Sequence, residues 1–213
     1  MMRRGKPVDH VDIKVVLLGK AFAGKTCLVQ RYIHQTYNDT PYSNTIGAAF
    51  ASKKLISKGK HVVMNVWDTA GSERYQSMSK IYYRGARAAI LCYDLTDKTS
   101  FEKVRFWVGE LQTNEENCRM YLCGTKKDLI DDDPESRAVS LSVVQSLAQD
   151  LQSDIYETSS VTGETIDEMF DKIAADYVIN MKNIPPTTEN GADESVILNE
   201  YSPPVHRWRC SQC

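Results

Sequence analysis

The stretch Gly19–Thr26 reads GKAFAGKT and matches the pattern G-x-x-x-x-G-K-[ST]. The apolar run Ile13–Leu18 precedes it and predicts a buried strand. Apolar residues then recur at helical spacing, at Leu28, Val29, Tyr32 and Ile33. Between a strand and a helix, successive backbone N–H groups form a nest for anions, at the positive end of the helix. The stretch therefore predicts a site for a nucleoside di- or triphosphate, rather than a glycine turn followed by a chance Lys-Thr.

Two side chains of this loop have expected roles. Lys25 would bridge the β- and γ-phosphates, and the hydroxyl of Thr26 would ligate Mg²⁺. The nucleotide is also expected to contact Phe22, Ala23, Gly24 and Cys27. Asp68 follows VVMNVW like a Walker B carboxylate and would hold the metal through water, although a capping Asp at a strand end is the alternative. Gly71 follows at the spacing that lets a backbone N–H reach a γ-phosphate.

The rest of the chain alternates strands with helices. KKLISKGKHVVMNVW predicts a hairpin that turns over Ser57–Lys60 at Gly59. Two continuous apolar runs, Ala88–Asp94 and Met120–Gly124, are typical of parallel strands covered on both faces. The pattern predicts an α/β domain whose sheet is mostly parallel, with one antiparallel edge hairpin.

Two helix starts are predicted from capping boxes. Thr99 with Glu102 precedes one apolar helical pattern, and Thr165 with Glu168 precedes the last one. The last helix is expected to bury one face, formed by Ile166, Met169, Phe170, Ile173 and Tyr177.

The composition bounds the class of protein. The chain has 213 residues, 42% of them hydrophobic, which suffices for one domain with a full core. A formal net charge of -2 gives no reason to expect a nucleic-acid partner. MMRRGKPVDHVD lacks the apolar run of a signal peptide, and no stretch is apolar over the length of a bilayer. Cysteines in YLCGT and ILCYD indicate reduced thiols, so a cytoplasmic protein is expected.

Four further segments are typical of one family: NTIGAAF (Asn44–Phe50), WDTAGSERY (Trp67–Tyr75), IYYRGA (Ile81–Ala86) and LCYDLTD (Leu91–Asp97). With GKAFAGKT they make the chain resemble the Rab family of the Ras superfamily of small GTPases, and GAAF, TKKD and the serine of WDTAGSERY are most similar to the Rab twenty-four subtype. The resemblance implies a P-loop small GTPase fold, with a mostly parallel six-stranded sheet, one antiparallel edge strand and helices on both faces. It divides the chain into an N-terminal extension (1–10), a GTP-binding domain (11–181) and a flexible hypervariable tail (182–213).

The resemblance also implies a switch that binds GTP or GDP with Mg²⁺. Thr45 is expected to bind Mg²⁺ and the γ-phosphate, and to release them after hydrolysis. Tyr37 is placed across the guanine, although an ordinary tyrosine at a helix end explains it equally well.

The base pocket is expected in GTKKD and ETSSVTG. A carboxylate at Asp128 can accept from guanine N1–H and the 2-amino group together, which adenine cannot offer, and the stem of Lys126 can lie against the base. Thr125 stands where the family has asparagine. The base is also expected to meet the last loop at Ser159, Ser160 (through its N–H) and Val161, which replaces a lysine. Each lost polar contact costs on the order of 1 kcal/mol. Selectivity for guanine is expected to survive through Asp128, while retention weakens.

Ser72 stands in WDTAGSERY where the family has the glutamine that orients the attacking water. A serine is too short to span that distance without an additional water. Ala21 adds a side chain where it crowds the γ-phosphate and an incoming catalytic group. Both changes remove transition-state positioning and leave ground-state binding intact. Lys25, Gly71 and Ser72 are the expected catalytic residues, with very slow intrinsic hydrolysis.

The chain ends in HRWRCSQC, and the resemblance implies prenyl groups on Cys210, Cys213 or both. A metal or redox pair is the weaker alternative, because this C-x-x-C lacks a second ligand pair. The protein is expected reversibly on the cytosolic face of intracellular membranes, endosomal or autophagic ones by the subtype resemblance. The implied partners are exchange factors, GTPase-activating proteins, a GDP-dissociation inhibitor, a prenylation escort protein and effectors.

The leading hypothesis is therefore a GTP-hydrolysing switch of Rab type in vesicle and membrane trafficking. A non-cycling scaffold that holds nucleotide and recruits partners to membranes is the alternative, favoured by the departures at Ala21, Ser72, Thr125 and Val161. A nucleotide kinase would also need an acceptor site and an arginine-bearing lid, and no segment indicates one.

Overall fold

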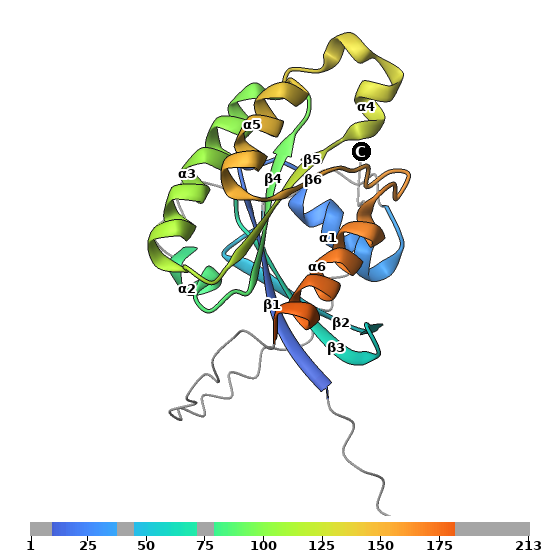
Figure 1. Cartoon of the computed structure of the whole chain (residues 1–213). Coiled ribbons are helices and arrows are strands. Elements are labelled where there is room, and N and C mark those ends of the chain that lie inside the picture. Colours follow the sequence, from blue (N-terminus) through green and yellow to red (C-terminus); the bar gives the residue numbers. More distant parts are fainter. Residues whose placement is uncertain (1–9, 38–44, 72–78, 182–213) are drawn as a thin grey trace, which may run out of the picture. The chain divides into compact units, whose positions relative to one another are not determined.

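The computed structural model describes residues 10–37, 45–71 and 79–181 (Figure 1). The strands are β1 (His10–Gly19), β2 (Ala48–Ser57), β3 (Lys60–Thr69), β4 (Ala88–Asp94), β5 (Arg119–Thr125) and β6 (Asp154–Glu157). The helices are α1 (Lys25–His34), α2 (Ser79–Tyr83), α3 (Lys98–Asn114), α4 (Lys127–Asp132), the 3-10 helix η2 (Pro134–Ser136), α5 (Leu141–Leu151) and α6 (Ile166–Asn180). No helix in the described ranges combines the length and apolarity needed to cross a bilayer.

The six strands form one sheet in the order β2-β3-β1-β4-β5-β6. β2 pairs antiparallel with β3, and every other neighbouring pair is parallel. The predicted fold class is confirmed, and so are the individual strands predicted from apolar runs. β6 has only four residues, all partly exposed, so no apolar run marks it in the sequence.

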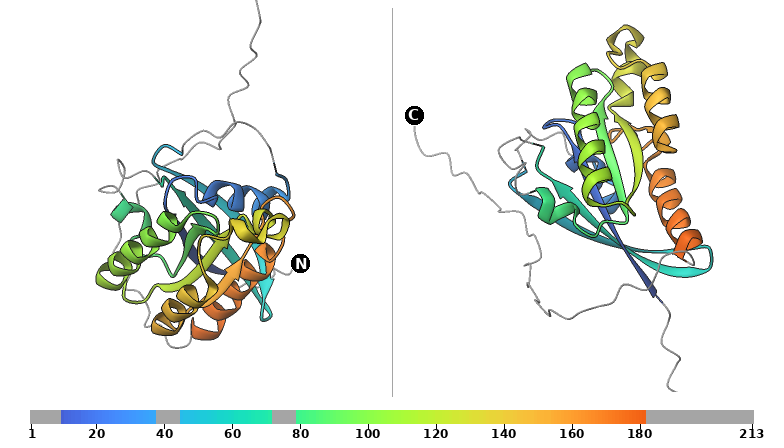
Figure 2. Two further views of the ribbon diagram at one scale, coloured as in Figure 1. Left: turned by 90° about the horizontal axis from the view of Figure 1, so that it is seen from above. Right: turned by 60° about the vertical axis from the view of Figure 1, so that its left-hand side comes forward.

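Two layers of helices cover the sheet, α1 and α6 on one face and α3 and α5 on the other (Figure 2). Because successive side chains of a strand point to opposite faces, β1 supplies both cores. Ile13, Val15 and Leu17 lie in the cluster with α1 and α6, whereas Val16 and Leu18 lie in the cluster with α3. A central strand buried on both faces accounts for the continuous apolar run before the glycine loop.

The hairpin between β2 and β3 turns where the sequence predicts. Lys58 and Gly59 both have positive φ, 48° and 75°. A two-residue turn of this kind matches the twist of antiparallel strands, and a glycine in its second position avoids strain.

The first predicted capping box is misplaced, and the second gives the right start for α6 without the capping hydrogen bond. α3 starts at Lys98, and Asp97 caps it by accepting from the N–H of Thr99 at 2.9 Å. The residue before α6, Thr165, has φ 57°, which differs from the extended backbone of an N-cap. Its hydroxyl donates instead to the backbone oxygen of Glu157 at 2.5 Å. A threonine three residues before a glutamate does not reveal which neighbour its hydroxyl will meet.

A ring stack joins α1 to α6. The centroids of Tyr32 and Phe170 are 3.7 Å apart, and the ring planes differ by 9°. Phe170 is fully buried on the predicted apolar face of α6, together with Ile166, Met169 and Ile173, while Tyr177 is partly buried.

Phe170→Ala should lower the free energy of unfolding by about 3–5 kcal/mol, because it leaves a cavity against Tyr32. Ile179→Ala on the same helix is the matched control, since Ile179 is 57% exposed, and should change stability by about 0.5 kcal/mol or less. Denaturant unfolding at a fixed ligand concentration measures both. Equal effects would contradict the assignment of Phe170 to the core.

Candidate nucleotide and magnesium site

The glycine loop lies between the carboxyl end of β1 and the first turn of α1. Lys25, the first residue of α1, is 4% exposed. Its Nζ donates to the backbone oxygens of Gly19 at 3.2 Å and Lys20 at 2.9 Å. Burial lowers the pKa of Lys25. An ammonium has three donors, so one remains for an anion at the mouth of the loop.

Two glycines let other segments approach the loop closely. A Cβ on Gly71 would lie 2.3 Å from the nitrogen of Ala21, so no side chain fits there. Gly24 has φ 72°, and a Cβ on it would lie 3.3 Å from the side chain of Thr125. The backbone of Gly71 therefore lies directly against the loop at Lys20 and Ala21.

Three oxygen-bearing side chains meet beside this loop. The hydroxyl of Thr26 donates to Asp68 Oδ2 at 2.6 Å and lies 3.0 Å from the hydroxyl oxygen of Thr45. Asp68 is 2% exposed and lies inside β3, which continues to Thr69, not after the strand as predicted. Its Oδ1 has no hydrogen-bond partner among the described residues. Burial raises the pKa of Asp68, and the hydrogen bond from Thr26 and the charge of Lys25 oppose this less strongly.

This set of oxygens fits a hard divalent cation. Mg²⁺ is usually held by one or two protein oxygens together with waters and phosphates. A cation would also satisfy the orphaned oxygen of Asp68 and offset the burial of its charge.

The residues expected at the base are brought together at the carboxyl end of β5. Ser159 is fully buried, and its hydroxyl donates to Asp128 Oδ1 at 2.6 Å. Lys126 has φ 61°, and its Nζ lies 2.5 Å from Asp94 Oδ2. The carboxylate of Asp128 thus keeps acceptor capacity in a fixed position.

Thr125 is buried and bonded within the protein. Its hydroxyl lies 3.2 Å from the backbone oxygen of Ala23 and 3.0 Å from that of Tyr93. The hydroxyl therefore links the phosphate loop to β4. Because its single hydrogen is used in that link, Thr125 provides no polar donor for a base.

Ala23 is buried, and the remaining predicted site residues are partly or largely exposed or lie outside the described ranges. Phe22 has φ 65° and is 56% exposed, Val161 is 45% exposed, and Tyr37 is 40% exposed, three residues after α1 ends. Cys27 is half-buried on α1. Three predicted residues lie outside the described ranges: Ser72, Cys210 and Cys213.

Sequence reasoning missed the contacts that two basic residues make at the site. Lys20 donates to Asp97 at 2.8 Å, and this bond is the main cause that lowers the pKa of Asp97 to about 2. Arg31 donates to the backbone oxygens of Ser160 and Val161. No signal in the sequence could have revealed these contacts, because each joins segments far apart in the chain.

Residues 14–178 match the sequence profile of the Ras family. The chain belongs to the Ras family. Ras-related protein Rab-24 of Dictyostelium discoideum is 46% identical over 173 residues, which cover 81% of this chain and 84% of that protein. RYL2 of Yarrowia lipolytica, a Ras-like GTP-binding protein, is 38% identical over 78% of this chain and 81% of its own length. RABF2b of Arabidopsis thaliana is 42% identical over 77% and 80%.

These matches confirm the resemblance to Rab proteins and to the Rab-24 subtype. The small-GTPase fold of the Ras family is the fold described above.

This Ras-family domain carries an aromatic cluster beside the site. Phe50 and Trp67 meet edge to face with centroids 5.3 Å apart, and Tyr82 lies 6.3 Å from Trp67. Phe50 is 47% exposed, whereas Trp67 is half-buried against the core, so both combine packing with surface.

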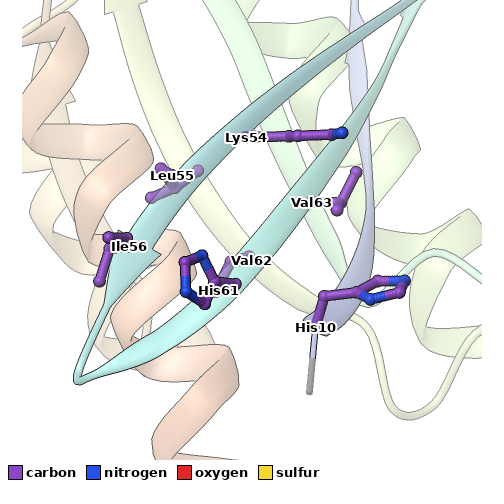
Figure 3. A pocket seen from close by; sticks show the side chains of 7 residues that line it. All are labelled: His10, Lys54, Leu55, Ile56, His61, Val62 and Val63. Carbon is purple, nitrogen blue, oxygen red and sulfur yellow. The ribbon is translucent and has the colours of Figure 1, made fainter. Parts of the chain in front are cut away.

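A hollow of about 340 Å³ lies at the opposite end of the same strands (Figure 3). It is lined by His10, Lys54, Leu55, Ile56, His61, Val62 and Val63. His61 is the second residue of β3 and Asp68 lies near its end, so at roughly 3.3 Å per residue the hollow is about 20 Å from the oxygen cluster. It does not belong to the phosphate site.

Asp68→Asn should raise the free energy of unfolding of the metal-free protein and lower the affinity for nucleotide in Mg²⁺. In excess EDTA, a neutral amide in place of a buried charge should raise the free energy of unfolding by about 1–3 kcal/mol. Asp132→Asn, at an exposed position on α4, is the control. If Asp68→Asn lowers the free energy of unfolding in EDTA as much as it does in Mg²⁺, the assignment of Asp68 to the metal is contradicted.

The pH dependence has a defined sign. The folded pKa of Asp68 is raised above its unfolded value, which is about 4, so the folded state binds the proton more tightly. In EDTA the wild-type protein should therefore gain stability as pH falls through the raised pKa, and Asp68→Asn should remove that gain.

Proposed function

We propose that this chain is a GTP-binding switch of Rab type that regulates intracellular membrane trafficking and hydrolyses GTP very slowly by itself. The observation that carries the proposal is the pair of buried charges, Lys25 and Asp68, beside the oxygens of Thr26 and Thr45. These charges and oxygens suit a phosphate chain with Mg²⁺. Asp128, which lies beyond the carboxyl end of β5, suits a guanine.

Each group around the phosphates has a definite role. Lys25 binds the β- and γ-phosphates, and the backbone N–H groups from Phe22 to Cys27 surround the phosphate oxygens. Thr26, Thr45 and Asp68 hold Mg²⁺, which supplies positive charge to the phosphate oxygens when bound. The N–H of Gly71 meets the γ-phosphate, so the presence of that phosphate is transmitted to the segment after Gly71.

Guanine selectivity is assigned to Asp128. Asp128→Ala should weaken GDP and GTP binding at least tenfold and reduce the preference over ADP and ATP, because it removes the acceptor for two donors of the base. Asp132→Ala on the same short helix is the matched control. Competition against a fluorescent guanine nucleotide in Mg²⁺ measures both variants. A wild-type protein that binds adenine nucleotides equally well would contradict the function itself.

Slow hydrolysis is assigned to Ser72 with Ala21. Ser72→Gln should raise the single-turnover rate of bound GTP at least tenfold, because the amide reaches the attacking water, and should leave nucleotide affinity nearly unchanged. Ser72→Ala is the control for loss of the hydroxyl alone. If the glutamine variant turns over no faster than wild type, the serine does not limit the rate.

The non-cycling scaffold remains the second candidate. It is favoured by the link that Thr125 makes within the protein and by Val161, both of which leave the base with fewer polar contacts. The two functions differ in one observable. A switch binds its effectors through Phe50, Trp67 and Tyr82 only in the GTP state, whereas a scaffold binds partners equally with GDP.

Membrane attachment is assigned to prenyl groups on Cys210 and Cys213, with late endosomal or autophagic membranes as the compartment. Two chains would anchor the protein stably, and one only reversibly. Intact-mass measurement of the protein from eukaryotic cells should show a mass increase that Cys210→Ser with Cys213→Ser abolishes. Two unmodified thiols would remove the basis for the anchor.

A further inference from the structure

An arginine on α1 reaches the last loop of the domain. Arg31 lies in the last turn of α1. Its Nε donates to the backbone oxygen of Ser160 at 2.6 Å, and its Nη2 donates to that of Val161. Its Nη1 donates to the oxygen of Gln35 at 3.1 Å, just beyond the helix. A planar guanidinium presents its donors in a fixed fork, so both loop carbonyls are held in one orientation.

The orientation of these carbonyls determines where the loop N–H groups point. In a trans peptide group the N–H points away from the C=O, and none of the described peptide bonds is cis. The groups that Arg31 holds carry the N–H of Val161 and of Thr162, which therefore face away from Arg31. The Thr162 N–H donates to Ser159 Oγ at 3.2 Å, and the same Oγ donates to Asp128. The side of the loop opposite Arg31 is thus the side of Asp128.

We propose that Arg31 is a positioning residue of the base pocket, which turns the N–H of Val161 toward the oxygen at position 6 of a guanine. The inference rests on the proposed function and assigns part of its specificity. Val161 has no polar side-chain atom, so its contact with the base falls on its backbone. The stem of Arg31 lies beside Gly163 of the same loop, since a Cβ on Gly163 would be in van der Waals contact with Cδ of Arg31 at 3.7 Å.

The position of Arg31 also joins the two ends of the nucleotide site. Lys25 and Thr26 begin α1, and Arg31 lies in the last turn of this ten-residue helix. Loss of the clamp should therefore speed release of nucleotide from the base end. It should leave the phosphate contacts intact, so the single-turnover rate of bound GTP stays the same.

The test compares release of GDP with release of 6-thio-GDP, in which sulfur, a weak acceptor, replaces the oxygen at position 6. Wild type should release 6-thio-GDP several-fold faster than GDP. Arg31→Ala should release GDP several-fold faster than wild type, a factor typical of one hydrogen bond to the base, and the ratio between the two nucleotides should fall toward one. Arg31→Lys should lie between them, because one ammonium cannot hold both carbonyls equally. Arg105→Ala on α3, at an exposed position, is the control and should match wild type.

The outcomes separate the inference from the function. If Arg31→Ala speeds both nucleotides by the same factor, it loosens the domain in general and the inference is overturned. Unchanged release in Arg31→Ala overturns it as well. Should that variant fail to fold, Arg31→Lys carries the test, and a ratio equal to that of wild type overturns the inference. A wild-type protein that binds no guanine nucleotide overturns the proposed function, and the inference with it.

Discussion

A buried ammonium and a buried carboxylate stand where neighbouring strands β1 and β3 end, and the rest of the site depends on them. Lys25 is 4% exposed and Asp68 is 2% exposed. Within the described ranges, no salt bridge joins the two, and the ammonium of Lys25 donates to neutral backbone oxygens. Buried charges without direct counter-charges are costly. A phosphate chain and a divalent cation would together supply both missing partners, so the proposed function predicts that ligand binding stabilises this domain.

Three contacts hold the base end of the site to its neighbours, and two of them reach the phosphate loop or α1. The hydroxyl of Thr125 links the loop to β4, the ammonium of Lys126 lies against Asp94, and Arg31 holds the last loop from α1. None of them needs a long polar side chain at position 161. The proposed base end would thus combine the carboxylate of Asp128 with backbone groups whose direction is set by neighbouring side chains. Such a pocket would keep its shape while it offers the base fewer side-chain contacts than a pocket with asparagine at position 125 and lysine at position 161.

Much of this arrangement could be predicted from the sequence because it depends on local rules. The apolar runs of β1, β4 and β5 and the hairpin turn at Gly59 each follow from a short pattern. Contacts that depend on packing could not be predicted. Thr165 bonds to Glu157 instead of capping α6, and β6 is too short and exposed to carry an apolar signal. Arg31 meets a loop 129 residues later, which no spacing rule encodes.

The most direct test of the central claim is the identity of the nucleotide that remains bound when the protein is purified in Mg²⁺ without added nucleotide. Chromatography after gentle denaturation identifies it. Predominantly GTP is the result that the proposed function predicts, because the buried lysine and carboxylate would retain the triphosphate while Ser72 and Ala21 would leave its hydrolysis slow. Predominantly GDP would contradict slow hydrolysis, and an adenine nucleotide would contradict the guanine site at Asp128.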